Sequence, residues 1–179
     1  MTSTEKKLRF LDKRQSKFFQ TVRQRVEEYF KKNNLSKNAT SEMYLKTILF
    51  LGGAVILYLL IMMGNFPLWQ MWLLAILLGI CKALIGFNVA HDAIHGSYTK
   101  NPTFNKWLGR ISFNFIGGND YVWSITHNLV HHTYTNIPGH DEDIEVAPGL
   151  LRISPEEKWK PYMRYQQWYA FPLYGLAYL

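Results

Sequence analysis

Cysteine and histidine are both scarce in this chain of 179 residues. The single cysteine, Cys81, excludes an intrachain disulfide framework and a zinc site built from several cysteines. Because Cys81 lies in an apolar segment, we expect it to pack as a small hydrophobic side chain. All six histidines lie between positions 91 and 140. That confinement needs an explanation from the segments around it.

Charged residues are also few, at 18% of the chain, and the basic excess is local. Residues 1–46 hold twelve Lys or Arg and five Asp or Glu, a net charge of +7, whereas residues 47–179 hold eight of each kind. We expect no secretory signal, because the first apolar run begins only near residue 44. Residues 1–43 therefore form a basic N-terminal segment. The apolar runs that follow favour a membrane setting, with no nucleic-acid partner.

Two apolar runs are long enough to cross a bilayer. Residues 47–63 carry no charge, and with the residues from Tyr44 onward they reach about the twenty residues that a span needs. Residues 68–90 form the second run, in which Lys82 is the one charged residue. The short Gly- and Pro-containing turn between them predicts an antiparallel hairpin with spans at about 44–63 and 68–90. Basic residues ahead of the first span predict a cytoplasmic N-terminus, which places the end of the second span at the cytoplasmic face.

The remaining segments predict shorter helices outside the lipid. Residues 8–32 have the apolar spacing of an amphipathic helix, lying on an anionic membrane surface or docked on the protein itself. Residues 104–115 show the same pattern, and a further helical stretch is expected over 121–135. Residues 139–149 form an acidic loop, and Ser154 followed by Pro155 predicts a helix start.

The last apolar run, about 166–179, is too short to span a bilayer and has the composition of a third span cut off in its first half. Together these segments predict an all-α integral membrane protein. It has a transmembrane helical hairpin, amphipathic helices at the cytoplasmic face and a truncated third span.

The histidines form two clusters, HDAIH at 91–95 and HNLVHH at 127–132. His91 and His95 are four residues apart, as are His127 and His131, and this spacing places both rings of a pair on one helix face. His132 adds a fifth imidazole. Five nitrogens exceed the three or four protein ligands of a zinc site, and imidazole suits iron. The clusters therefore predict one transition metal with a larger shell, or two metals.

Other polar residues near the clusters are weaker candidates for metal ligands or for hydrogen-bond partners of the ligands. His140 lies in the acidic loop and is a less favoured ligand. Asp92, Asn128, Asp141 and Asp143 are candidates to accept hydrogen bonds from ligating imidazoles, although the aspartates are equally well read as solvated loop charges. Neither cluster carries the glutamate of the HExxH zinc proteases, and no G-x-S-x-G nucleophile elbow supports acyl transfer.

HDAIH followed by HNLVHH, each after a hydrophobic segment, resembles the histidine boxes of the membrane-bound fatty acid desaturases. The continuation HHTYTNIPGHDEDIE is most similar to the branch that includes linoleoyl-CoA (delta-6, front-end) desaturases. The resemblance covers residues 44–179, which would be the N-terminal part of a desaturase domain. It implies two non-haem irons at the cytoplasmic face. The implied ligands, catalytic through the metal, are His91 and His95 of the first box and His127, His131 and His132 of the second.

The reaction implied by the resemblance is the oxygen-dependent insertion of a double bond into a long acyl chain on CoA or on a membrane lipid. A metal is needed because no side-chain acid or base breaks an unactivated C–H bond. The electrons would come from a separate donor, ferredoxin or cytochrome b5, since no HPGG-type haem motif is present. Tyr121, Trp123 and the Gly117–Gly118 turn are expected either to line the acyl tunnel or to serve in ordinary packing.

One departure from the family concerns its third histidine box, because this chain has no histidine after His140. We expect a fragment of a longer desaturase in preference to an inactive truncated membrane protein. A related fatty acid hydroxylase or sphingolipid desaturase is an open alternative. The two boxes do not distinguish these enzymes.

Overall fold

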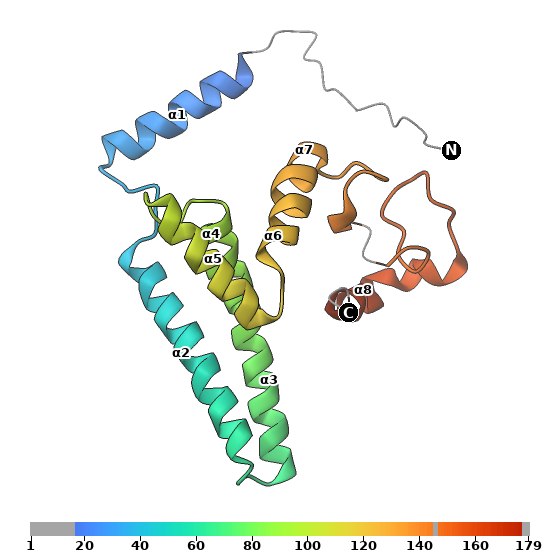
Figure 1. Cartoon of the computed structure of the whole chain (residues 1–179). Helices are drawn as coiled ribbons and strands as arrows, with labels where there is room; N and C mark the ends of the chain where they lie inside the picture. Colours follow the sequence, from blue (N-terminus) through green and yellow to red (C-terminus); the bar gives the residue numbers. More distant parts are fainter. Residues whose placement is uncertain (1–16, 145–146, 177–179) are drawn as a thin grey trace.

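The computed structural model describes residues 17–144 and 147–176. Within those residues every regular element is helical, and the β-type pairing is one isolated bridge between Pro148 and Leu151. The helices run in the order α1 (Phe18–Lys32), α2 (Ser41–Met63), α3 (Leu68–Ile85), η1 (Gly86–Ala90), α4 (His91–Ile94), α5 (Pro102–Ile116), α6 (Asp120–Trp123), η2 (Ser124–His131), α7 (His132–Tyr134), η3 (Glu142–Ile144), η4 (Pro161–Tyr165) and α8 (Gln166–Leu176). The predicted all-α class is confirmed (Figure 1).

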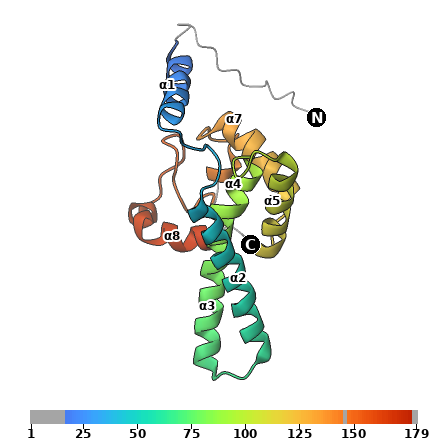
Figure 2. The same cartoon turned by 90° about the vertical axis from the view of Figure 1, so that its left-hand side faces the viewer.

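Helices α2 and α3 form an antiparallel hairpin that projects from the rest of the molecule (Figures 1 and 2). Gly64 ends α2 in the left-handed conformation, at a φ of 66°. The second helix runs on through η1 and α4, so that Ser41–Met63 and Leu68–Ile94 are both long and apolar enough to cross a membrane. Only 6% and 17% of their most apolar stretches are buried inside the protein. Outward-facing apolar surface of this extent favours a lipid surrounding, whereas the cytoplasmic orientation stays a prediction.

The small core of the molecule lies where the upper half of the hairpin meets the chain that follows α4. Its fully buried members are Ala54, Ile85, Val89, Ala93 and Tyr98. The hydroxyl of Tyr98 lies 2.6 Å from Thr47 Oγ1 on α2, and the Tyr98 carbonyl accepts the backbone N–H of Ala39. Cys81 packs against this cluster, which confirms its predicted hydrophobic role. These contacts fix the end of the second long helix, where the first histidine pair lies.

Helix α5 returns alongside that end, and both of its ends follow from sequence. Asn101 caps the first turn by accepting the N–H groups of Thr103 and Phe104, with Pro102 at the first helical position. Gly117 ends the helix at a φ of 92°, a conformation that favours glycine. The predicted helix over 104–115 is therefore confirmed. Helix α5 packs against η1, α4 and α3, so it supports the histidine-bearing turn from one side (Figure 1).

Gly109 is the point of closest approach between α5 and α4. A Cβ atom built there would lie 2.9 Å from Cγ1 of Ile94 and 3.7 Å from Cβ of Ala93. We expect Gly109→Ala to lower the melting temperature of the detergent-purified protein, because an overpacking cost of about 1–3 kcal/mol exceeds the gain of about 1 kcal/mol in helix propensity. Gly79→Ala, also in a helix but with nothing within 4 Å, is the matched control and should not lower it. Equal melting temperatures for the two variants would contradict this packing.

The segment after the acidic loop departs from the sequence prediction. The helix start at Pro155 is wrong, since residues 154–157 form turns and the next helix, η4, begins at Pro161. A hydrogen bond typical of a helix N-terminus is nevertheless present, because the Glu157 carboxylate accepts the N–H of Ser154 at 3.1 Å. Pro161 disfavours the helical conformation at the residue before it, and Lys160 is accordingly extended (φ −128°, ψ 147°).

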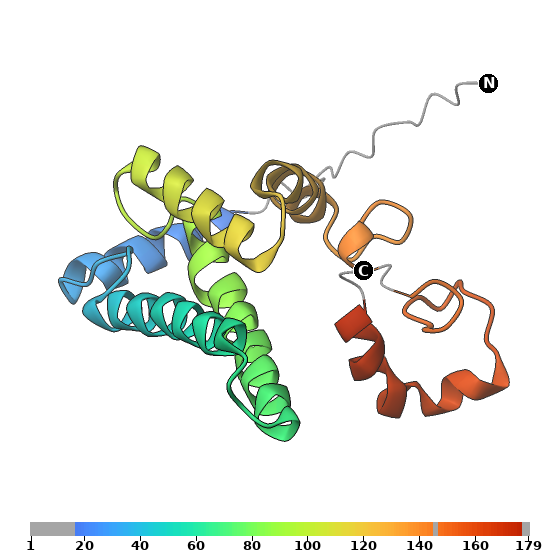
Figure 3. The same ribbon diagram turned by 60° about the horizontal axis from the view of Figure 1, so that its bottom comes forward.

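The two ends of the described chain carry the remaining expectations. Helix α1 covers residues 18–32 of the predicted amphipathic helix and has no buried residue, while residues 8–16 lie outside the described part. Helix α8 occupies most of the expected third apolar segment, and residues 177–179 lie outside the described part. It packs against η4, in an arm that lies to one side of the hairpin (Figure 3). A third span therefore stays a prediction.

Candidate metal centre

The five histidines of the two clusters lie together. The helices α4 and α7, to which His91 and His132 belong, lie at the end of the hairpin opposite its turn (Figures 1 and 2). The ring centres of His91 and His95 are 4.4 Å apart, and those of His127 and His131 are 4.9 Å apart. The two pairs meet across the helices, since His127 lies 5.5 Å from His91 and 5.4 Å from His95. His132 lies 4.9 Å from His95. Residues that are 32 or more positions apart in sequence thus form one cluster of imidazoles.

A π-helical turn explains why both His131 and His132 reach the cluster. The backbone N–H of His132 donates to the carbonyl of His127, an i to i−5 bond, within the π-helix η2. Residues four and five positions apart then return to the same face, whereas in an α-helix the fifth residue would be displaced by about two fifths of a turn. The ring centres of His131 and His132 are accordingly 4.9 Å and 5.0 Å from that of His127.

Two carboxylates of the acidic loop orient the second histidine pair. Asp143 Oδ2 lies 2.8 Å from His127 Nδ1, and the Asp141 oxygens lie 2.9 and 3.0 Å from His131 Nδ1. Asp141 is fully buried and also accepts the backbone N–H groups of Asn136 and Asp143. In each pair Nδ1–H donates to the carboxylate, so the lone pair on Nε2 is left for a metal. The sequence alone favoured equally the alternative that these aspartates are solvated loop charges. For Asp141 that alternative is wrong, because its side chain is buried.

The electrostatics of the cluster favour neutral imidazoles. Burial, followed by the neighbouring rings of His91, His132 and His127, lowers the pKa of His95 to about 4. Burial also lowers the pKa of His127, although its hydrogen bond to Asp143 opposes the shift. Burial alone would raise the pKa of Asp141, but its hydrogen bonds from His131 and two backbone N–H groups outweigh this and lower it. At neutral pH His95 and His127 therefore offer unprotonated nitrogens, which is the form that binds metals.

Two nitrogens of the cluster have no hydrogen-bond partner. The Nε2 atoms of His95 and His127 are both buried and unpartnered. A buried polar atom in this state is costly unless something binds it. One ligand atom each from His91, His95 and His127 lie within 4.8 Å of one another, and a second group of the same size joins His127 and His131 to Asp143. The residues present fit a metal ion held by His91, His95 and His127, with imidazole donors of the kind that iron accepts. In the second group the Nδ1 atom of His127 is engaged by Asp143, and that of His131 by Asp141.

The other residues singled out from sequence lie around this cluster. Trp123 stacks on the ring of His127 at 4.1 Å and also contacts Phe113. Asn128 donates to the carbonyl of Ile94 at 3.4 Å, which joins η2 to α4. Asp92 Oδ1 lies 3.3 Å from Nδ1 of the adjacent His91.

His140, the weaker candidate, is not in the cluster and packs against the ring of Tyr134 at 5.3 Å. Tyr121 is exposed, and Gly117 and Gly118 form the turn after α5. A tunnel lined by Tyr121 and Trp123 stays a prediction.

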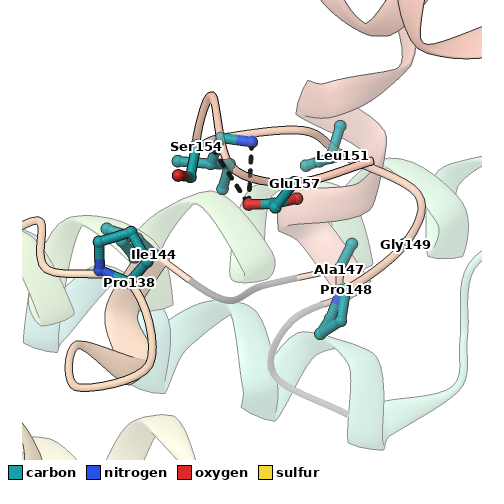
Figure 4. Close-up of a pocket in the computed structure, with 9 residues that line it drawn as sticks. Pro138, Ile144, Ala147, Pro148, Gly149, Leu151, Ser154 and Glu157 are labelled. Carbon is teal, nitrogen blue, oxygen red and sulfur yellow. Dashed lines mark hydrogen bonds between the residues drawn. The ribbon is translucent and has the colours of Figure 1, made fainter. Parts of the chain in front are cut away.

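A pocket of about 310 Å³ lies between the acidic loop and the segment that follows it (Figure 4). It is bordered by Ile144, Pro148 and Leu151, and its one charged residue, Glu157, is engaged by the backbone N–H groups of Ile153 and Ser154. None of the six histidines lines it. The pocket therefore offers no imidazole to a metal ion, and the candidate metal ligands are those of the histidine cluster.

Comparison with known proteins identifies relatives over most of the chain. Residues 67–179 match the model of the fatty acid desaturase family. The chain is 37% identical to the sn-1 linoleoyl-lipid 6-desaturase of Arthrospira platensis over 97% of its length, and 38% identical to the enzyme of that name in Synechocystis sp. over 96%. An acyl-lipid (8-3)-desaturase of Physcomitrium patens is 32% identical over 94% of the chain. No solved structure matches.

The chain covers a smaller share of the length of these relatives. The chain spans 46% of the two 6-desaturases and 35% of the Physcomitrium patens protein. The family match includes both histidine clusters, all of α5 and the acidic loop. This chain belongs to the fatty acid desaturase family.

Proposed function

We propose that the chain is the N-terminal part of an iron-dependent desaturase that inserts a double bond into a long acyl chain carried by a lipid. The observation that carries the proposal is the convergence of five imidazoles, from helices far apart in sequence, at the end of an apolar hairpin. A site in this position adjoins the membrane from which a fatty acyl chain would enter. The relatives named as linoleoyl-lipid and acyl-lipid desaturases support an acyl-lipid substrate over acyl-CoA.

In this proposal His91, His95, His127, His131 and His132 hold two non-haem irons, with further ligands from outside residues 1–179. The bound iron supplies the oxygen chemistry that removes hydrogen from an unactivated chain, which side chains alone do not provide. Asp141 and Asp143 hold the rings of His131 and His127 in one tautomer and one orientation. Trp123, stacked on His127, excludes water from that side of the cluster.

The setting follows from the same elements. The helices Ser41–Met63 and Leu68–Ile94 span the membrane, with the N-terminus and the histidines on the cytoplasmic side. Basic residues outnumber acidic ones in the segment before the first span and support this orientation. The two electrons for each turnover come from a separate donor protein, ferredoxin or cytochrome b5.

The test is product analysis of the complete gene product, expressed in a host that makes linoleoyl lipids but no further desaturated ones. We expect a new, more unsaturated fatty acid by mass spectrometry and about two irons in each purified chain. A hydroxylated acyl chain as the main product would replace the desaturase assignment with a hydroxylase. Purified protein without iron and without any product would remove the enzyme assignment.

A further inference from the structure

Helix α1 presents an apolar surface that no other described part of the chain buries. None of its 15 residues is buried, and the helix stands clear of the hairpin (Figures 1 and 2). Phe18 and Phe19 are both 73% exposed, and Tyr29 is 59% exposed. An isolated helix of this length is only marginally stable in water. The stability of α1 therefore calls for a surface on which its apolar side chains can lie.

The apolar residues of α1 share one face. At 3.6 residues per turn, successive residues are about 100° apart around the axis, and the six large apolar side chains fall within an arc of about 120°. They are Phe18, Phe19, Val22, Val26, Tyr29 and Phe30. The first five are exposed and Phe30 is partly buried. A continuous face of this width, rich in aromatic side chains, is typical of a helix that lies in the interface of a membrane.

The charged residues of α1 are arranged around this apolar face by sign. Arg23 borders the face on one side, and Arg25 and Lys32 border it on the other, each within about 40° of its edge. The two acidic residues, Glu27 and Glu28, lie at least about 60° from the face. Long basic side chains at such borders can lay their apolar stems along lipid while their charged ends reach the phosphates.

Contacts within the structure occupy the acidic residues and leave the basic borders free. Glu27 forms an ion pair with Lys37, in the connection to α2, and Glu28 accepts a hydrogen bond from Gln24 at 2.8 Å. Among residues 17–144 and 147–176, no ion pair engages the three basic residues that border the apolar face. Their charges are therefore available to anions outside the protein.

The connection between α1 and the first long helix keeps α1 near one end of the hairpin. Asn38 Nδ2 donates to the carbonyl of Ser97 at 3.0 Å, and the N–H of Ala39 donates to the carbonyl of Tyr98 at 3.0 Å. These bonds fix the connection to the chain that follows α4, at the end opposite the hairpin turn (Figure 1). Only residues 33–37 lie between α1 and Asn38, and five residues reach at most about 17 Å.

We infer that α1 lies in the surface of an anionic lipid leaflet, with its apolar face in the lipid and Arg23, Arg25 and Lys32 on lipid phosphates. The inference rests on the membrane setting proposed for the hairpin and not on the desaturase reaction. The cytoplasmic leaflet, on the side proposed for the N-terminus, is the one that carries anionic lipids. A lipid surface is favoured over an acidic protein such as the electron donor, because six large apolar side chains need cover in addition to three charges.

The experiment measures amide hydrogen exchange of the complete protein by mass spectrometry. The protein is placed in nanodiscs of phosphatidylcholine alone, in nanodiscs of an equal mixture of phosphatidylcholine and phosphatidylglycerol, and in an uncharged detergent. We expect residues 22–32 to exchange at least about tenfold more slowly in the mixed nanodiscs than in phosphatidylcholine. Residues 85–93, which belong to the core, should exchange at the same rate in both. Raising the salt from about 0.05 to about 0.5 M should speed the exchange of α1 in the mixed nanodiscs.

Two pairs of variants separate the apolar face from the charges. Val22→Ser with Val26→Ser removes part of the apolar face at little cost in helix propensity, and Gln20→Ser with Gln24→Ser is the matched control on the opposite face. In the mixed nanodiscs the first should exchange as wild type does in phosphatidylcholine, and the second as wild type does in the mixture.

The second pair changes charge alone. Arg25→Gln with Lys32→Gln removes two border charges, whereas Arg25→Lys with Lys32→Arg keeps them, and all four substitutions retain good helix formers. The charge-removing variant should lose the difference between the two kinds of nanodisc, and the charge-keeping variant should retain it. The salt and lipid comparisons on wild type do not depend on the folding of any variant.

Three results would overturn the inference. Equal protection of α1 in both kinds of nanodisc would exclude a role for anionic lipid, and its persistence in detergent would show that α1 docks on the protein itself. Equally fast exchange in all three media would show that no lipid surface covers the helix. Protection that appears only after ferredoxin or cytochrome b5 is added would make α1 a docking face for the electron donor.

The measurement is independent of iron and of turnover. An inactive protein with lipid-dependent protection of α1 would contradict the proposed desaturase function alone. An active enzyme without that protection would contradict only the membrane contact of α1.

Discussion

Replacing His95 with alanine in the complete protein should abolish the unsaturated product and remove most of the bound iron. His95 is central to the cluster, with its ring within 5.4 Å of those of His91, His127 and His132. Its buried Nε2 has no hydrogen-bond partner within the protein and lies among the other imidazoles of the cluster, so it is available to bind a metal ion. The loss should exceed about a thousandfold in turnover, because a metal site that lacks one of its ligands would lose both its metal and the chemistry that the metal supplies.

The control is another histidine in the same region. His140→Ala changes a ring that packs against Tyr134 and lies outside the cluster, so iron content and product should stay near wild type. His131→Ala should behave like His95→Ala, since both rings belong to the cluster. Membrane insertion should be intact in all three variants and is checked by the protease sensitivity of the hairpin turn. Normal turnover by His95→Ala, or equal losses in His140→Ala, would show that the clusters are not the metal site.

The five histidines were identifiable from sequence because i, i+4 spacing survives any small change in helix geometry. The two π-helical turns were not. A pattern of apolar residues does not distinguish an i to i−5 bond from an i to i−4 bond over one turn. Yet η2 is the reason that His131 and His132 both face His127. Sequence therefore predicted which residues meet, and tertiary packing determined how.

The hairpin was predicted to within a few residues, since a charge-free run of spanning length has few alternatives. The turn at Ser154 was mistaken for a helix start because its local hydrogen bonds are those of a capping motif. The helix that does form, η4, begins seven positions further on, at Pro161. The Arg110–Asp120 ion pair was not predicted, because the two side chains come together only when α6 folds back beside α5.

Replacing Asp141 with asparagine should weaken iron binding about 10- to 100-fold while keeping the fold. The side chain of Asp141 is fully buried and accepts hydrogen bonds from His131 Nδ1 and from the backbone N–H groups of Asn136 and Asp143. An amide of the same shape has one oxygen in place of two, so a donor is left facing another donor. The cost of about 1–3 kcal/mol for an unsatisfied buried group should also lower the stability of the iron-free protein.

The carboxylates offer a graded series for the same measurement. Asp143 is 37% exposed and makes a 2.8 Å contact with His127, whereas Asp92 is 40% exposed and lies 3.3 Å from His91. Iron affinity, measured by competition with a chelator, should therefore fall most in Asp141→Asn, less in Asp143→Asn and least in Asp92→Asn. Losses of equal size in the three variants would show that burial and hydrogen-bond count do not determine the effect.

A double-mutant cycle separates positioning from general destabilisation. If Asp141 acts by orienting the ring of His131, then Asp141→Asn should cost little further iron affinity once His131 is already alanine. If instead the substitution only loosens the acidic loop, the two losses should add. The melting temperature of the iron-free proteins is the second measurement. Asp141→Asn should lower it even when His131 is already alanine, because the backbone N–H groups of Asn136 and Asp143 still lose part of their acceptor. Full additivity in iron affinity would show that Asp141 does not position His131 and that it only stabilises the acidic loop.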